Sequence, residues 1–475
     1  MSEHPVEDAK VETYLNHWIE AHREEMVGVL QELIQITSVL EEAGEGQPFG
    51  TFIAQALDRT LEIGKQMGFS VRNYDGYAGT IRLDGPGKEI GILSHLDVVP
   101  AGDPAVWEHP PFAGVVKDGK IYGRGSLDDK GPLVAALFAM KAVMDSGAPI
   151  QNAVCHIIGT DEETAHRGLT YYLEKQKAPW GGFSPDANFP VIHGEKGILR
   201  FSVEGEWKPE EQAAVILEEL QGGTVPNAVP SQARAVFRCG EEGENCLRNV
   251  YEQIAGRNGM SLKKEGNCWV LTAEGVGAHA MQPWEGDNAI QKLLPVLKKL
   301  ELGAAGQWLQ AIHCLFGQGW TGEGVGISCQ DQLSGPLTIN LGTIYVKEGK
   351  GTCGLDIRYP IHVDGKRLWN TICTNCQEYG LKAQMGRQGD PLYVPEKSSL
   401  VQTLLGVYNR CMDTAEKPMV IGGGTYCRDV ANFVSFGPVF PGGKELAHER
   451  NEYMEVEQLI QCAKIYAQAI YQLAK

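Results

Sequence analysis

Residues 89–100 read EIGILSHLDVVP, a nearly continuous apolar run that contains Ser94, His95 and Asp97. Runs without alternation of polar and apolar residues are typical of strands buried on both faces of an α/β sheet. The three polar side chains are anomalous in such a strand and need a separate explanation. The stretch therefore predicts a buried strand with polar groups toward its end.

The segments that follow extend this strand into a sheet. Residues 130–144 place apolar side chains at three- and four-residue steps, which predicts a helix. Residues 152–160 are again apolar and lead directly into Asp161-Glu-Glu163, which predicts a second buried strand. Strand, helix and strand with polar residues at the strand ends indicate a doubly wound sheet. Such sheets place their active sites beyond the carboxyl ends of the strands.

The character of the sequence changes near residue 195, where glycine is frequent and short strand-like runs alternate with helices. We predict an inserted α+β lid domain at residues 195–385. It interrupts a discontinuous α/β catalytic domain, with a mixed sheet flanked by helices, at residues 1–194 and 386–475. A chain of 475 residues is also too long for one hydrophobic core, which agrees with more than one domain.

The composition excludes several classes of function. A formal net charge of −18 leaves no basic surface for nucleic acid. The acidic residues 1–8 lack the features of a signal peptide, and no run approaches the roughly 18 apolar residues of a membrane helix. We expect a cytoplasmic protein with no nucleic-acid or membrane partner and with its 12 cysteines reduced. Cys373 and Cys376 form a lone C-x-x-C in a helical run, and because no second pair completes a zinc site we expect neither a structural nor a redox role for them.

Histidine and acidic residues gather at the predicted strand ends and in later loops. The set comprises His95, Asp97, Asp128, Asp129, Asp161, Glu162, Glu163, Asp186 and His448. Imidazole and carboxylate ligands suit Zn²⁺, Mn²⁺ or Co²⁺, and the lack of thiolates argues against a structural zinc site. Two cations roughly 3.5–4 Å apart need about five such ligands, one of them a bridging carboxylate. Taken alone, each residue could instead be a core histidine or part of a solvated acidic turn.

Several motifs, all in one order, resemble the M20 metallopeptidases. They are Ser94-His-Leu-Asp-Val-Val-Pro100, Gly123-Arg-Gly-Ser-Leu-Asp-Asp-Lys-Gly131, Gly159-Thr-Asp-Glu-Glu163, and Phe183-Ser-Pro-Asp-Ala-Asn-Phe-Pro190 with Gly194-Glu-Lys-Gly197. Gly422-Gly-Gly-Thr-Tyr426 and Ala447-His448 narrow the resemblance to the branch that includes dipeptidase V. The resemblance extends from about residue 10 to residue 470. It implies a zinc-peptidase-like catalytic domain with a lid.

The resemblance also implies a dinuclear metal site, with Zn²⁺ expected and Mn²⁺ or Co²⁺ as alternatives. The implied ligands are His95 and Asp186 for one cation, Glu163 and His448 for the other, and Asp128 as the bridge. Glu162 would be the general base that deprotonates a water between the cations, giving a bridging hydroxide. Asp97 lies two residues after His95 and so points to the same side of the strand, where it would orient the imidazole.

Lid residues are implied to bind substrate. His279 would reach the scissile carbonyl oxygen, and its place in a separate domain means that catalysis should require closure. Asn227 would contact the substrate, and Arg358 would bind its terminal carboxylate, although Arg358 alone could equally be a strand-end salt bridge. The backbone N–H groups of Gly423, Gly424 and Thr425 could also receive this carboxylate, or the glycines could serve turn geometry alone.

The expected activity is the hydrolysis of dipeptides with a free N-terminal amine. In the family, Asp rather than Glu at the position of Asp186 occurs mainly where the substrate has this amine. An N-acyl amino acid deacylase or desuccinylase is the alternative enzyme, and a non-catalytic binding protein of the same fold is the third possibility. The long insert would fill the space of a partner subunit, which implies a monomer. Met281 replaces the small polar residue usual after the lid His-Ala pair, which leaves side-chain specificity open.

Overall fold

The computed structural model describes residues 4–209, 213–254 and 259–475. Contacts divide the chain into two compact units. The first unit contains residues 1–194, 393–419 and 425–475, and the second contains residues 195–392 and 420–424. The catalytic and lid roles predicted for these parts of the chain stay predictions.

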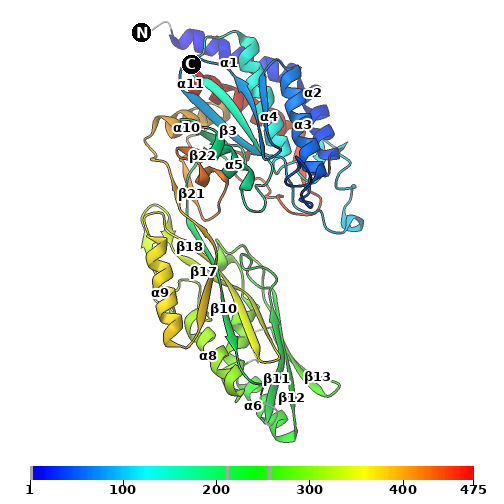
Figure 1. Cartoon of the computed structure of the whole chain (residues 1–475), viewed down its shortest axis with the longest axis vertical. Helices are drawn as coiled ribbons and strands as arrows, with labels where there is room; N and C mark the ends of the chain where they lie inside the picture. Colours follow the sequence, from blue (N-terminus) through cyan, green and yellow to red (C-terminus); the bar gives the residue numbers. More distant parts are fainter. Residues whose placement is uncertain (1–3, 210–212, 255–258) are drawn as a thin grey trace. The chain divides into compact units, whose positions relative to one another are not determined.

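The first unit is built on a mixed sheet with the strand order β1-β2-β6-β3-β7-β22-β9-β20, to which β21 adds beside β9 (Figure 1). The central strand β3 pairs in parallel with β6 and β7, while β2 pairs antiparallel with β6. The strands of this sheet are β1 (Ser70–Tyr74), β2 (Ala78–Leu83), β3 (Glu89–His95), β6 (Ala153–Gly159), β7 (Gly181–Ser184), β9 (Ile192–Glu195), β20 (Leu392–Tyr393), β21 (Met419–Ile421) and β22 (Phe433–Ser435).

Helices cover this sheet, as an α/β fold requires. The helices of the first unit are α1 (His4–Ala21), α2 (Arg23–Gln35), α3 (Thr51–Gln66), α4 (Lys130–Ser146), α5 (Arg167–Lys175), α10 (Ser399–Met412) and α11 (Val456–Ala474). Short strands occupy its loops: β4 (Val115–Lys117), β5 (Lys120–Tyr122), β8 (Ala187–Asn188), β23 (Pro438–Val439) and β24 (Tyr453–Glu455). Two 3₁₀ turns, η1 (Pro104–Val106) and η3 (Tyr426–Asp429), complete the unit.

The segments chosen from the sequence form the centre of this unit. The strand predicted in residues 89–100 is β3, which is buried from Ile90 to His95, and the second predicted strand is β6, buried throughout. The predicted helix is α4, which is buried over most of its length because it packs against both the sheet and α11. A helix and two strands that are hydrophobic all round belong in the middle of a protein. The predicted α/β class is confirmed.

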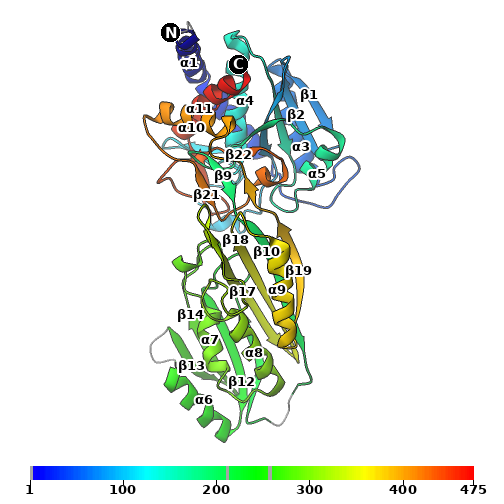
Figure 2. The same ribbon diagram turned by 90° about the vertical axis from the view of Figure 1, so that its left-hand side faces the viewer.

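The second unit is an antiparallel sheet in the order β13-β14-β12-β11-β17-β18-β10-β19, with helices lying along it (Figure 2). Its strands are β10 (Gly197–Glu206), β11 (Val215–Gly222), β12 (Gln232–Cys239), β13 (Met260–Glu265), β14 (Cys268–Glu274), β17 (Thr338–Lys347), β18 (Lys350–Tyr359) and β19 (Lys382–Gly389). Its helices are α6 (Glu241–Ile254), α7 (Ala289–Leu297), α8 (Gly303–Phe316) and α9 (Gly365–Glu378). The turn η2 (Pro283–Glu285) and the paired strands β15 (Gln330–Asp331) and β16 (Gly335–Pro336) lie in its loops. The second unit thus has the α+β composition that the sequence predicted.

The cysteines and the helices bear on two further expectations. All twelve cysteines are free thiols, and Cys373 and Cys376 lie together on α9. Among the residues that the structure describes, no helix has the length and apolar character needed to cross a membrane.

Candidate metal centre and substrate site

The chain topology brings the predicted ligands to one edge of the first unit's sheet. His95 is the last residue of β3, Glu162 and Glu163 follow β6, and Asp186 follows β7. These three strands run parallel, and His95 lies opposite Gly159 at the end of β6. Because parallel strands end at the same edge, side chains far apart in the sequence become neighbours.

Asp128 lies between two histidines at the centre of the cluster. One carboxylate oxygen of Asp128 is 3.0 Å from His95 Nε2, and the other is 3.2 Å from His448 Nε2. His95 Nε2 is also 3.6 Å from Asp186, and His448 Nε2 is 2.9 Å from Glu163. A carboxylate in this position can serve as the bridge of a two-metal site.

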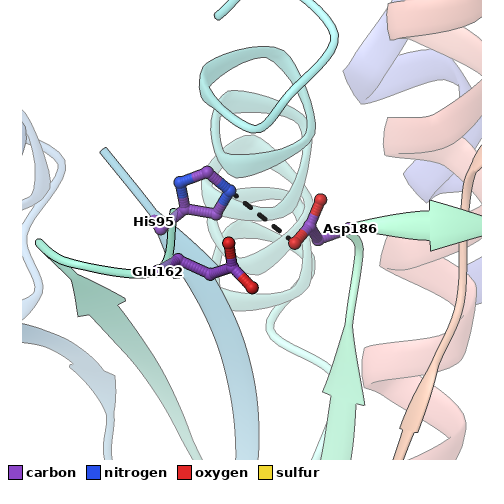
Figure 3. A group of neighbouring side chains, drawn as sticks. All are labelled: His95, Glu162 and Asp186. Atoms are coloured by element: carbon purple, nitrogen blue, oxygen red, sulfur yellow. Dashed lines mark ion pairs between the residues drawn. The ribbon is translucent and has the colours of Figure 1, made fainter. Parts of the chain in front are cut away.

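Two groups of side chains have the geometry to hold a metal ion. The first consists of His95, Glu162 and Asp186, which converge in Figure 3. The second consists of Asp128, Glu163 and His448. Within each group the ligand atoms lie within 4.8 Å of one another. Glu162 stands with the first group, so position alone does not distinguish a base from a ligand there.

The electrostatics of the cluster favour cations. Burial, together with the charge of Asp128, raises the pKa of Glu163 to about 7, and the same two causes raise the pKa of Asp186 well above its usual range. Among the described residues, no lysine or arginine forms an ion pair with any of these three carboxylates. Crowded, partly buried carboxylates beside imidazoles are the chemistry of a divalent metal site, so the residues fit the implied ions.

His95 is oriented by the backbone of Asp97 more closely than by its carboxylate. His95 Nδ1 donates to the carbonyl oxygen of Asp97 at 2.9 Å, while the nearest carboxylate oxygen is 3.6 Å away. A hydrogen on Nδ1 leaves the Nε2 lone pair directed toward Asp128. The Asp97 carboxylate instead accepts the backbone N–H groups of Glu162 (3.1 Å) and Glu163 (3.0 Å). Asp97 therefore links the ends of β3 and β6.

Glu452 is a supporting residue that the sequence analysis did not identify. Its side chain is fully buried, and its carboxylate accepts the backbone N–H groups of Gly125 (3.1 Å), Leu127 (2.8 Å) and Asp128 (3.2 Å). Arg124 donates to the same carboxylate at 2.6 Å. No motif marked this glutamate, because it is one acid among several in residues 445–457.

Arg124 connects this support to the second histidine. Its Nη2 donates to the carbonyl oxygen of His448 at 3.1 Å. His448 has a left-handed backbone conformation (φ 65°), which costs a non-glycine residue on the order of 1–3 kcal/mol and needs such contacts to persist. Arg124 and Glu452 together therefore hold the loops that carry Asp128 and His448.

The second unit brings several predicted substrate-binding residues together. The Ala280 N–H, next to His279, donates to the Asn227 carbonyl at 2.9 Å, and the ring of His279 accepts the Met281 N–H at 3.1 Å. The side chain of Met281 in turn lies against Gly422 and Gly423. The Asn227 and His279 segments are thus neighbours within this unit.

Arg358 lies in the same unit and is almost fully buried. Its guanidinium donates to Asp356 at 2.5 and 3.2 Å, and to the carbonyl oxygen of Gly422 at 2.8 Å. Arg200 also donates to Asp356 at 2.6 Å, so two arginines share one carboxylate and one positive charge remains.

Thr425, at the end of the glycine loop, belongs to the first unit and is buried. Its hydroxyl lies 3.1 Å from Ser435 Oγ and accepts the Cys427 N–H at 3.2 Å. Gly424, just before it, is exposed.

Comparisons with known proteins decide the family. The model of peptidase family M20/M25/M40 matches residues 91–472. The chain belongs to this family. A Bacillus subtilis (strain 168) protein named "Putative dipeptidase YtjP" is 37% identical over 462 residues, which cover 95% of this chain and 98% of that protein. A Staphylococcus aureus (strain USA300) protein named "Putative dipeptidase SAUSA300_1697" is 34% identical over 464 residues, which cover 96% of this chain and 98% of that protein.

Solved structures show the same fold at much lower identity. Human carnosine dipeptidase 1 aligns with a TM-score of 0.62 at 14% identity, covering 98% of each chain. The dipeptidase Dug1p from Saccharomyces cerevisiae aligns with a TM-score of 0.60 at 14% identity, covering 97% of this chain and 98% of that one. The M20 chain described here is a peptide hydrolase of a metal-dependent family, which confirms the predicted class of enzyme.

Proposed function

We propose that this M20 peptidase is a dinuclear dipeptidase that hydrolyses dipeptides with a free N-terminal amine. The observation that carries the proposal is Asp128, whose two oxygens lie 3.0 and 3.2 Å from two histidines that each face a further carboxylate. The relatives described as dipeptidases, which match nearly the whole chain, support the substrate class.

Two divalent cations, expected to be Zn²⁺, would be held by five side chains and would supply Lewis acidity and water of lowered pKa. These side chains are His95, Asp128, Glu163, Asp186 and His448. Glu162 would accept a proton from the attacking water and return it to the leaving amine, a contribution typically worth about 10²–10⁴-fold in rate. Its carboxylate oxygen lies among the ligand atoms of the first group, as this role requires.

Substrate recognition is assigned to residues of the second unit and to the loop that ends at Thr425. His279 would donate to the developing oxyanion, a contribution worth about 3–4 kcal/mol in other enzymes. Arg358 carries the excess positive charge that a substrate carboxylate needs. We further propose contacts from Asn227 and from the backbone of Gly423, Gly424 and Thr425, and a monomeric enzyme.

A substrate screen tests the proposal. Purified protein loaded with Zn²⁺ or Mn²⁺ is offered Ala-Ala and Xaa-His dipeptides beside N-acetyl and N-succinyl amino acids. Turnover of free-amine dipeptides is expected, whereas turnover of only the acylated compounds would establish a deacylase instead. In parallel, the Glu162→Ala variant should lose hydrolysis while keeping about two equivalents of metal. Full activity in that variant would overturn the assigned base.

A further inference from the structure

His166, which is not one of the five proposed metal ligands, lies next to the Glu162 carboxylate. His166 Nδ1 is 2.5 Å from Asp429 Oδ2, and His166 Nε2 is 3.5 Å from Glu162 Oε1. The three residues come from the loop after β6, the start of α5 and the turn η3, and all belong to the first unit. They form a line in which one imidazole joins two carboxylates.

The order of atoms in this line fixes the direction of its hydrogen bonds. An ionised carboxylate can only accept, so the hydrogen between His166 and Asp429 is on Nδ1. The other ring nitrogen faces an oxygen of Glu162, which is also an acceptor. The ring therefore interacts favourably with Glu162 when Nε2 too carries a hydrogen. Asp429 favours this arrangement by placing a negative charge on the far side of the ring.

The surroundings leave the ring little freedom. His166 is buried, and its ring and that of Tyr426 meet edge to face, at a centroid distance of 4.8 Å and an interplanar angle of 80°. The His166 N–H donates to the carbonyl oxygen of Asp161 at 2.8 Å, which fixes the backbone immediately before α5. Its φ of 55° is in the left-handed region, where a histidine stays only if its contacts hold it there.

A fixed ring restricts the carboxylate that it faces. Glu162 has three rotatable side-chain bonds, and a general base must hold its oxygen within hydrogen-bond reach of the proton it takes. The contact between Oε1 and His166 Nε2 therefore limits how the Glu162 carboxylate can turn beside the first metal group. His166 itself is in neither of the two groups that could hold a metal ion among the described residues.

We propose that His166, held by Asp429, is a positioning residue that orients the Glu162 carboxylate. The inference rests on the proposed function, because it takes Glu162 to be the base of that reaction. It adds a supporting line, from Asp429 to His166 to Glu162, that is separate from the metal ligands. Outer partners of this kind typically change activity about 10–100-fold when removed.

Kinetics of four variants test the positioning role. His166→Phe keeps a ring for Tyr426 but loses both nitrogens, and His166→Gln can restore one N–H toward Glu162. Asp429→Asn keeps an acceptor for the ring without its charge. Tyr171→Phe is the matched control. Tyr171 also lies on α5, and this change removes only the hydroxyl that donates to Asp75.

For His166→Phe we expect kcat to fall about 10–100-fold. KM should stay within about threefold, and the metal content should stay near two equivalents. The kcat values of Asp429→Asn and His166→Gln should lie between those of His166→Phe and wild type, and the kcat of Tyr171→Phe should equal that of wild type. A kcat for His166→Phe within about twofold of wild type, a change in KM alone, or loss of metal would each overturn the inference.

A spectroscopic measurement separates this inference from the substrate assignment. In metal-free protein labelled with ¹⁵N-histidine, the ring signals of His166 are those lost in His166→Phe. They should shift in Glu162→Gln and in Asp429→Asn but not in Tyr171→Phe. If the enzyme cleaves none of the offered dipeptides yet these shifts occur, the dipeptidase proposal fails while the contact stands. If Glu162→Gln leaves the His166 signals unmoved, the positioning role is refuted.

Discussion

Removing the Glu452 carboxylate should both destabilise the first unit and weaken metal binding at its candidate metal site. In Glu452→Ala, Arg124 keeps a buried charge without its partner, and breaking a buried pair in this way costs about 3–5 kcal/mol. The N–H groups of Gly125, Leu127 and Asp128 also lose their acceptor, at about 1–3 kcal/mol each where water cannot enter. Water that enters the space left by the carboxylate can accept hydrogen bonds from some of these N–H groups. We therefore expect the free energy of unfolding of the first unit to fall by about 5 kcal/mol.

The backbone hydrogen bonds allow this role to be distinguished from that of an ordinary ion pair. Buried ion pairs can often be replaced by apolar residues of similar volume without loss of stability. In the double variant Arg124→Met/Glu452→Leu the charges are gone, but the three N–H groups still lack an acceptor. We therefore expect the double variant to stay well below wild type in stability. Glu457→Ala is the matched control, because Glu457 forms an exposed pair with Arg23, with its side chain 78% exposed, and should cost less than about 1 kcal/mol.

Hydrogen exchange measured by mass spectrometry is the suitable assay. The two units can unfold separately, so a single unfolding curve for the whole chain would not report the stability of the first unit. Peptides from α4 report the first unit alone, and a loss of about 5 kcal/mol raises their exchange by roughly 10³–10⁴-fold. Affinity for Zn²⁺ should fall about 10–100-fold in the same variant, because Asp128 and His448 lose their support. Wild-type exchange in Glu452→Ala, or a double variant as stable as wild type, would refute the reasoning.

Three further predictions concern a buried histidine, the metal site and a close approach of two strands. Burial lowers the pKa of His156 to about 3, below the 6.5 of an unfolded histidine. As the pH falls from 6.5 toward 3, the unfolded state therefore binds a proton at this residue and the folded state does not. Stability should then fall by up to about 1.4 kcal/mol per pH unit from this group, and urea titrations of His156→Gln should show a correspondingly shallower slope between pH 6.5 and 5. Adding Zn²⁺ at about 100 times its Kd to chelated protein should stabilise the first unit by about 2.7 kcal/mol, seen as slower exchange in α4, and no response would argue against the site. In Gly182→Ala a Cβ would lie 1.8 Å from the Gly91 carbonyl oxygen, so β7 must separate from β3, and a thermal midpoint equal to wild type would contradict the close approach of these strands.

The core of the fold was predictable because its signals are local. Residues 89–95 and 153–159 are mostly apolar, and residues 130–146 have helical spacing, so the local pattern identifies β3, β6 and α4. Polar residues at the ends of such strands stand out against an apolar background. His95, Glu162 and Glu163 are therefore recognisable from the sequence, and parallel pairing of the strands brings them together.

The supporting residues were not predictable from any local pattern. Glu452 contacts a loop more than 300 positions away, and Asp429 reaches His166 across 263 positions. Each is an ordinary acidic residue in its own segment, without periodicity or motif. Residues 420–424 likewise pack with the second unit although the chain on both sides belongs to the first.

The sequence by itself determined which residues are candidates for the chemistry of the site, because candidate metal ligands and buried strands require residue types that can be recognised one segment at a time. Only the tertiary structure decided how those residues are held. Asp97 accepts the amides of Glu162 and Glu163, Glu452 accepts those around Asp128, and neither choice is encoded nearby. Almost every residue has the same backbone N–H group, so the sequence does not show which N–H groups a given carboxylate accepts.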